Sequence, residues 1–266
     1  KRLIRHPSVV GAERPFMLML KRELDELDIK TMLYDGLLVA EGYGGVGMLS
    51  AHIDRHGLIC TGPDEFQYAA FISKNRGDLT GDSISEQMFQ SIVERFVGEQ
   101  VHAYEPWSGS YQGVGQISRA FLCERRQSMI FSVQGLEYLS PGTPVAFTDQ
   151  LKYKDNLLSA QIDNVISAAL IIYLYKVGYQ GRAFFTAQEE SGRSWRYLLE
   201  WFRRYNIQTD SLLVLDTSPY PTRELAETQD IVLRHKDANA TFNSPLKQKI
   251  EALCQESDIR FGYKDS

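Results

Sequence analysis

Apolar residues recur along the chain at two spacings, and these predict helices and strands in turn. Residues 13–28 place apolar side chains three or four positions apart, with Pro15 in the first turn, which predicts an amphipathic helix. Residues 31–40 hold two short apolar runs on either side of Asp35-Gly36, a pair that favours a tight hairpin turn. A continuous apolar run then ends at His52, which predicts a buried strand.

The character of the chain changes between residues 58 and 154. Short alternating strands with many Gly and Pro surround one helical stretch at 85–96, which predicts an inserted, β-rich domain resembling a small barrel. Helices at 164–177 and 194–205 and strands at 182–186, 212–215 and 231–235 follow, and Ser244-Pro245 caps a last helix. We therefore expect an α/β fold, a mixed sheet flanked by helices, formed by residues 1–57 and 155–266.

Composition narrows the class of protein. With 266 residues and 43% hydrophobic content, the chain can bury a full core and could form two domains. A net charge of −5 without a basic run argues against nucleic acid or an anionic membrane as a partner. Three widely spaced cysteines, no membrane-length apolar run and no signal-peptide pattern predict a cytoplasmic protein with reduced thiols. The sequence does not begin with Met, so we expect it to be a segment of a longer chain.

Four side chains of metal-binding type stand at or near the ends of four apolar runs: His52, Asp163, Glu190 and Asp216. In α/β proteins the ends of such strands meet at one edge of the sheet, where ligands bind. One imidazole and several carboxylates gathered there would form an oxygen-rich site for a divalent cation. The pattern therefore predicts a metallohydrolase that uses water as its nucleophile.

Each of these residues also has a simpler interpretation. A lone His after a strand is often structural, although Asp54 on the same strand face could fix the tautomer of His52. Asp163 could be the N-cap of the following helix instead of a bridging ligand. Glu189 and Glu190 could be a solvated helix start, or one could bind metal while the other takes a proton.

Two further motifs are similar to known functional motifs, but the predicted strands and helices around them argue against those functions. Asp216-Thr217-Ser218 is similar to the tripeptide of aspartic proteases, but no second copy exists and the α/β alternation does not fit that all-β fold. The glycines at 42–47 fit the spacing of a dinucleotide-binding fingerprint, yet a strand follows them where that motif needs a helix. We therefore expect a flexible hairpin there and no nucleotide cofactor.

Taken in order, the motifs resemble the cocatalytic metallo-aminopeptidase family that includes glutamyl, deblocking and tetrahedral (TET) aminopeptidases. The matching segments are 51–57 (AHIDRHG), 162–164 (IDN), 186–192 (TAQEESG) and 215–217 (LDT). The β-rich insert between the first and second segments also agrees with the domain plan of that family.

The resemblance implies a residue-by-residue site. His52 and Asp216 would hold one metal, Glu190 the other, and Asp163 would bridge both. Glu189 would be the general acid/base and Asp54 would support the first site. The two ions would be zinc, with cobalt as an alternative, and the substrates would be peptides that lose N-terminal residues. The family also implies a homo-oligomer, with the dodecamer as a known form.

The sequence departs from the family pattern at three places, one of which is Val165, where the family usually has Arg or Asp after the Asp-Asn pair. A family histidine near the C-terminus completes the second metal site, and His235 comes too early to supply it, so we expect an incomplete C-terminus or a weakened site. Arg55-His56 replaces the commoner acidic-apolar pair, and we interpret His56 as a loop residue. Two alternatives stay open: a related metal-dependent deacylase or carboxypeptidase, and a non-catalytic peptide-binding or assembly homologue without the second metal.

Overall fold

The computed structural model describes residues 1–70, 86–123, 125–126, 128–148, 151–155, 157–209, 211–218, 220, 222–237, 240–242 and 244–265. These residues form two compact units, one that ends at Thr217 and one that begins at Ser218. All of the residues singled out as candidate ligands belong to the first unit.

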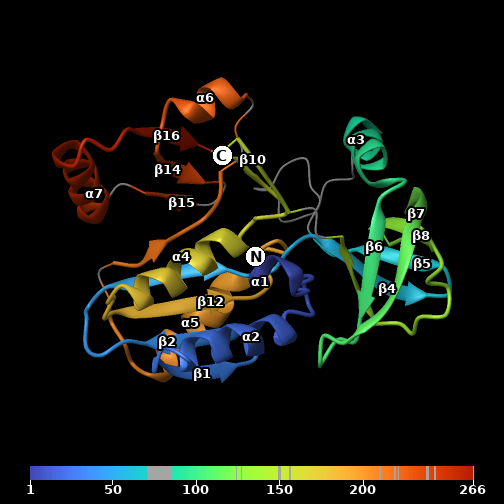
Figure 1. Ribbon diagram of the computed structural model, residues 1–266, viewed down its shortest axis with the longest axis horizontal. Helices are drawn as coiled ribbons and strands as arrows, with labels where there is room; N and C mark the ends of the chain where they lie inside the picture. Colours follow the sequence, from blue (N-terminus) through green and yellow to red (C-terminus); the bar gives the residue numbers. More distant parts are fainter. Residues whose placement is uncertain are drawn as a thin grey trace. The chain divides into compact units, whose positions relative to one another are not determined.

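The first unit contains a five-stranded mixed sheet (Figure 1). Its strand order is β1-β2-β12-β3-β13. The strands are β1 (Lys30–Tyr34), β2 (Leu37–Glu41), β12 (Arg182–Thr186), β3 (Met48–His52) and β13 (Leu213–Val214). Strands β12, β3 and β13 are parallel, whereas β1 and β2 are an antiparallel hairpin in which Tyr34 pairs with Leu37 across the predicted Asp35-Gly36 turn. The mixed sheet and the hairpin are confirmed.

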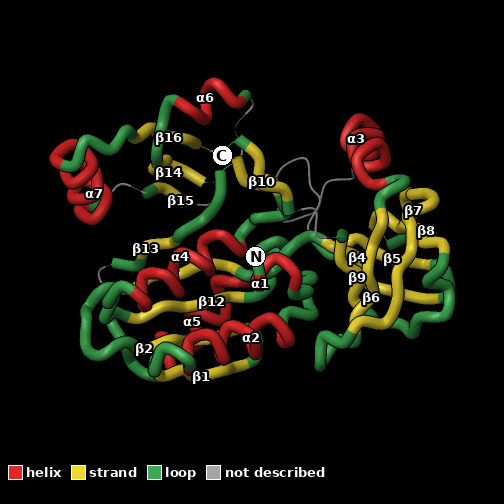
Figure 2. The backbone as a smooth tube through the Cα atoms, viewed as in Figure 1, coloured by secondary structure: helices red, strands yellow, loops and turns green. Residues whose placement is uncertain are grey.

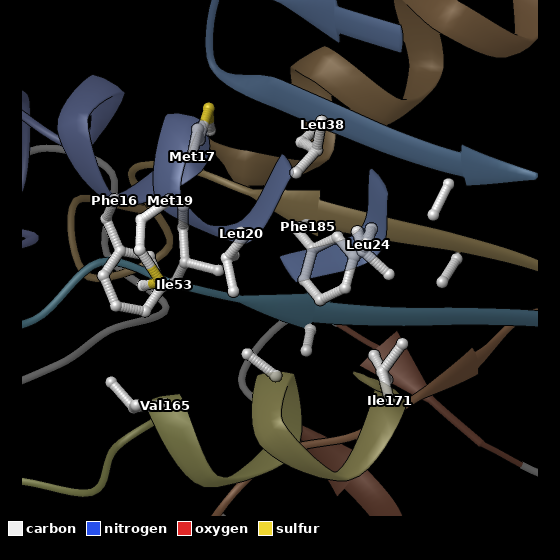
Figure 3. Packing of buried hydrophobic residues seen from close by; sticks show 14 of the residues in the cluster. Phe16, Met17, Met19, Leu20, Leu24, Leu38, Ile53, Val165, Ile171 and Phe185 are labelled. Carbon is white, nitrogen blue, oxygen red and sulfur yellow. The ribbon is translucent and has the colours of Figure 1, made fainter. Parts of the chain in front are cut away.

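Successive side chains of each strand point to opposite faces of the sheet, and both faces are apolar. Helices therefore cover both faces. Leu38 and Phe185 point to the face covered by α2 (Arg14–Asp25) and α4 (Val165–Lys176), as Figure 3 shows. The neighbouring residues Leu37 and Phe184 point to the opposite face and pack with Trp201 of α5 (Ser194–Arg204). The sheet is thus buried on both sides, and its strand ends are where polar side chains can gather.

A closed antiparallel barrel occupies much of the predicted insert (Figure 2). Its strands, in spatial order, are β4 (Gly57–Gly62), β5 (Glu65–Tyr68), β8 (Ser128–Gln134), β7 (Tyr111–Cys123), β6 (Gln100–Tyr104) and β9 (Pro144–Phe147). Phe66 and Phe131 are fully buried in its core, beside Phe96 from α3 (Glu86–Phe96). The barrel agrees with the expected architecture, while the domain bounds at 58 and 154 stay a prediction.

Three short elements complete the first unit: α1 (Arg2–Arg5) and the hairpin of β10 (Lys152–Lys154) with β11 (Leu157–Ser159). The second unit holds a sheet of β15 (Ala240–Thr241), β14 (Ile231–Asp237) and β16 (Phe261–Asp265), with α6 (Arg223–Glu227) and α7 (Pro245–Glu256). The Ser244 hydroxyl accepts the Lys247 N–H, as the predicted cap requires. None of the described helices combines the length and apolar character that crossing a membrane requires.

Candidate metal centre

His52 is the last residue of β3, and its buried ring faces two carboxylates from distant parts of the sequence. Its Nε2 atom lies 3.3 Å from Asp163 Oδ1 and 3.4 Å from Asp216 Oδ1. Asp216 follows β13, which pairs in parallel with β3, so both strands end at the same edge of the sheet. The structure therefore brings these three candidate ligands together.

Asp163 does not act as a helix cap. The N-cap position of α4 is Asn164, whose side chain makes no capping hydrogen bond and donates instead to the Leu215 carbonyl at 2.8 Å. This contact ties the start of α4 to the end of β13 and so fixes Asp163 beside Asp216. The Asp163 carboxylate remains half-exposed.

Glu189 and Glu190 follow β12, and they do not begin a helix, because α5 starts only at Ser194. The solvated-helix interpretation is therefore wrong. Both peptide N–H groups donate to the fully buried Asp54, at 3.0 Å from Glu189 and 2.9 Å from Glu190. Glu190 is buried and Glu189 is 40% exposed, so the two neighbouring carboxylates occupy different environments.

Asp54 also faces His52, whose Nδ1 lies 3.5 Å from Asp54 Oδ1. A carboxylate on the second ring nitrogen is the usual support of a metal-binding imidazole, because it fixes the tautomer that leaves Nε2 free. Burial alone lowers the pKa of His52, but hydrogen bonds with Asp163, Asp216 and Asp54 outweigh burial and raise it well above its usual range.

The pKa values of these carboxyl groups depend on one another as well as on His52. Burial raises the pKa of Glu189, the charge of His52 opposes burial, and the charges of Glu190, Asp216 and Asp54 add to it, so that the net pKa is about 7. Burial also raises the pKa of Asp163, but its contacts with His52 lower it more, so the net shift is downward. A carboxyl with a pKa near neutrality is suited to take and return a proton.

Two residues at the site were missed by the sequence analysis. Glu13 is buried, and its Oε1 accepts the Gly11 N–H at 2.8 Å and the Gln188 N–H at 3.2 Å. Glu13 and Asp54 therefore hold three consecutive peptide groups of the loop that carries Glu189. His56, interpreted as a loop residue, places its Nε2 2.7 Å from Glu190 Oε2.

The side chains present fit a divalent cation. Within the described residues, ligand atoms of His52, Asp163 and Asp216 lie within 4.8 Å of one another, and so do those of His52, Glu189 and Glu190. Negative charge exceeds positive charge in both groups, and carboxylate oxygens with an imidazole nitrogen suit zinc and related metals. The metal-ligand roles themselves remain predictions.

Comparisons with known proteins support the fold. The sequence matches no protein-family model and no curated protein sequence. Among solved structures, the chain is similar to PhTET1-12s, a dodecamer, with a TM-score of 0.69 and 16% identity over 100% of this chain and 82% of the other. A TET aminopeptidase from the marine sediment archaeon Thaumarchaeota archaeon SCGC AB-539-E09 gives a TM-score of 0.69 and 14% identity, covering 100% and 79% of the two chains.

A third similar structure is described as an endoglucanase from Thermotoga maritima, with a TM-score of 0.66 and 18% identity over 99% of this chain and 82% of the other. Identities this low establish the fold, and function must be argued from the site. The chain has the mixed α/β fold of TET aminopeptidases, and the resemblance drawn from its four motifs is confirmed at that level.

Proposed function

We propose that the protein is a metal-dependent aminopeptidase that removes N-terminal residues from peptides at a two-metal centre. The observation that carries this proposal is the convergence of His52, Asp163 and Asp216 within reach of one ion, with Glu190 beside them. His52 and Asp216 would hold the first ion, Glu190 the second, and Asp163 would bridge both. The fold shared with TET aminopeptidases supports this assignment.

The residues around the ions have separate tasks. Bound cations would supply the Lewis acidity that polarises a peptide carbonyl and makes water more acidic. Glu189 is partly exposed and is a candidate to accept the proton from the attacking water and return it to the leaving amine. Asp54 holds the peptide groups of Glu189 and Glu190 and so positions the base against the ligands.

The first test is metal content per chain, measured with hydrolysis of aminoacyl amides, N-acyl amino acids and peptides read from either end. We expect two zinc ions and chelator-sensitive release of N-terminal residues. Preference for N-acyl or C-terminal substrates would favour the deacylase or carboxypeptidase alternative. Absence of both metal and hydrolysis would favour a binding or assembly role.

Two variants separate the roles within the site. Glu189→Gln should lower kcat by at least about a hundredfold while metal content is unchanged, because only the base is lost. Glu200→Gln, an exposed substitution on α5, is the matched control. Asp163→Ala should lower occupancy at both metals, and loss of only one ion would contradict the bridging role.

We also propose that the chain forms a homo-oligomer, because PhTET1-12s is described as a dodecamer and shares the fold. Light scattering on the purified protein measures this directly. A mass that is a multiple of the 30.3 kDa chain would support the proposal, and a single-chain mass at all concentrations would oppose it.

A further inference from the structure

His56 and Tyr68 meet at the open end of the hairpin formed by β4 and β5. His56 stands directly before β4, Tyr68 is the last residue of β5, and the antiparallel register pairs Tyr68 with Leu58. The Ala69 N–H also donates to the Gly57 carbonyl at 2.9 Å, which continues the pairing towards His56. The hairpin therefore places the two side chains next to each other although they are 12 residues apart.

The main chain around His56 is fixed by contacts on both sides of it. The His56 carbonyl accepts from Gln161 Nε2 at 2.9 Å, two residues before Asp163. A Cβ at Gly57 would lie 2.9 Å from the Val145 carbonyl oxygen, so the chain after His56 packs closely against β9. The imidazole thus projects from a backbone that is held both by the barrel and by the segment that carries a candidate ligand.

Each nitrogen of the His56 ring contacts one side chain. Nδ1 lies 2.6 Å from the Tyr68 hydroxyl, and Nε2 lies 2.7 Å from Glu190 Oε2. The Tyr68 ring packs in turn against Phe96 and Phe131 of the barrel core, with ring centroids 5.8 Å and 6.1 Å away. The barrel therefore holds the hydroxyl in place, and the hydroxyl holds the imidazole against Glu190.

These contacts orient a buried carboxylate. The Glu190 side chain is only 5% exposed, and burial of a carboxylate is costly unless it accepts hydrogen bonds. A carboxylate oxygen accepts and does not donate, so His56 Nε2 donates to Glu190 Oε2, while Nδ1 and the Tyr68 hydroxyl satisfy each other whichever of them is the donor. A hydrogen bond to one oxygen leaves the other oxygen of Glu190 for a cation.

We propose that His56 is a positioning residue for Glu190 and that Tyr68 acts through His56, so that the barrel orients one ligand of the metal centre. This inference rests on the proposed metal centre, in which Glu190 holds the second ion. His56 stands where the resembling family commonly has an apolar side chain, so the link is a feature of this sequence and not of the family pattern. It also assigns a role to β5, which supplies the hydroxyl.

Zinc and cobalt titrations of the full chain test the role of His56. The parent should bind two ions, and His56→Ala should bind the second about tenfold to a hundredfold more weakly, with little change at the first. His56→Gln keeps an amide N–H near the position of Nε2 and should restore most of the affinity. His56→Asn is the matched control, because its shorter amide reaches the position of Nδ1 and should not restore it. Equal affinities of the Gln and Asn variants would contradict the assigned hydrogen bond.

The role of Tyr68 is tested by a double-mutant cycle. Tyr68→Phe removes only the hydroxyl and should weaken binding of the second ion by about tenfold. Added to His56→Ala, it should cause no further loss, because Tyr68 acts through the imidazole. Tyr111→Phe, at an exposed tyrosine of the same barrel, should leave both ions unchanged. Additive losses in the double variant would overturn the part assigned to Tyr68.

NMR of 15N-labelled histidine side chains gives a readout that needs no metal. In the presence of chelator, Tyr68→Phe should shift the Nδ1 resonance of His56 and leave those of His102 on β6 and His235 on β14 unchanged. An unmoved His56 resonance would overturn the link to the barrel.

The titrations also separate this proposal from the proposed function, and thermal melts check that each variant is folded. If the parent binds two ions and His56→Ala binds both as tightly, only the positioning role fails. If the parent binds neither zinc nor cobalt, the metal centre fails and the positioning role fails with it.

Discussion

Glu13 lies outside the candidate ligand set, yet it controls the position of the candidate base. Its Oε1 accepts the Gln188 N–H, immediately before the two peptide groups held by Asp54. The left-handed backbone at Gln188, with a φ of 61°, makes this loop dependent on such contacts, since L-residues rarely adopt it unaided. Two buried carboxyls therefore determine where Glu189 stands.

Replacing Glu13 should affect turnover more than substrate binding. Glu13→Ala leaves two peptide N–H groups without their acceptor, which costs about 1–3 kcal/mol of stability and loosens the loop. We expect kcat to fall at least about tenfold with KM little changed, because a small misplacement of the base slows the reaction. Glu13→Gln keeps the acceptor oxygen and should restore most of kcat. Equal losses in the two variants would contradict the role assigned to the hydrogen bonds.

The same carboxyl should make stability depend on pH. Burial, followed by the charge of Asp54, raises the pKa of Glu13 to about 8 from a usual value of 4.5. Between these values the folded state binds more protons than the unfolded state, so the free energy of unfolding falls as pH rises towards 8 and levels off above it. The slope approaches about 1.4 kcal/mol per pH unit for one proton.

Glu13→Gln removes this titration, so its stability relative to the parent should increase between pH 5 and pH 8. Denaturant unfolding at several pH values, with chelator present throughout, measures the difference without a contribution from metal. A constant difference across that range would contradict the raised pKa.

The sequence predicted some residues of the site and missed others for a physical reason. His52 ends an apolar strand and Glu190 and Asp216 follow soon after others, and parallel strands bring such ends together. Glu13 stands at the start of a helix, where a Glu is ordinarily explained by the helix dipole, and nothing local indicates that it is buried. Its role arises only from the return of the chain at Gln188, 175 residues later.

At the scale of secondary structure, the hairpin turn at Gly36 supports the same loop. Its carbonyl accepts the Ala187 N–H at 3.0 Å, and Gly36 adopts a left-handed φ of 71°. A Cβ at this position would overlap the ring of Tyr197 on α5. The turn therefore requires glycine for its backbone conformation and for close packing.

Gly36→Ala should destabilise the protein more than an equivalent change elsewhere. Gly178, at the end of α4, has a φ of 102° but open space around it, so Gly178→Ala measures the conformational cost alone, about 1–2 kcal/mol. We expect Gly36→Ala to cost at least about 2 kcal/mol more, because the Tyr197 ring must move. Denaturant unfolding of the two variants measures the difference, and equal losses would mean that the ring moves freely.

Elements with a clear apolar pattern were predicted well, and the shortest ones were not. The expected strand at 182–186 coincides with β12, and the helices expected at 194–205 and from Pro245 onward correspond to α5 and α7. The four-residue α1 and the three-residue strands β10 and β11 were missed, because so few residues carry no recognisable period. The strand order could not be predicted from the sequence, because β12 lies between β2 and β3 in the sheet although it comes much later in the chain.

At the scale of the whole molecule, the candidate ligands come from segments that the unfolded chain does not hold together. His52, Asp163 and Asp216 meet only when strands β3 and β13 pair and α4 docks beside them. A cation that needs all three should therefore bind the folded protein and not the unfolded chain. Folding and metal binding are then linked, and the melting temperature reports the linkage.

Removing the metal should lower the melting temperature. Adding metal back should raise the melting temperature progressively as the metal concentration increases. A ligand present at a hundred times its Kd adds about 2.7 kcal/mol to stability, which for a chain of this size is a shift of roughly 5–10 °C. His52→Ala removes the imidazole from the site of the first ion, so its melting temperature should rise less with zinc than that of the parent. Glu200→Gln, on the exposed surface of α5, should respond as the parent does. If His52→Ala kept the full zinc response, the zinc that stabilises the parent would not be bound by His52.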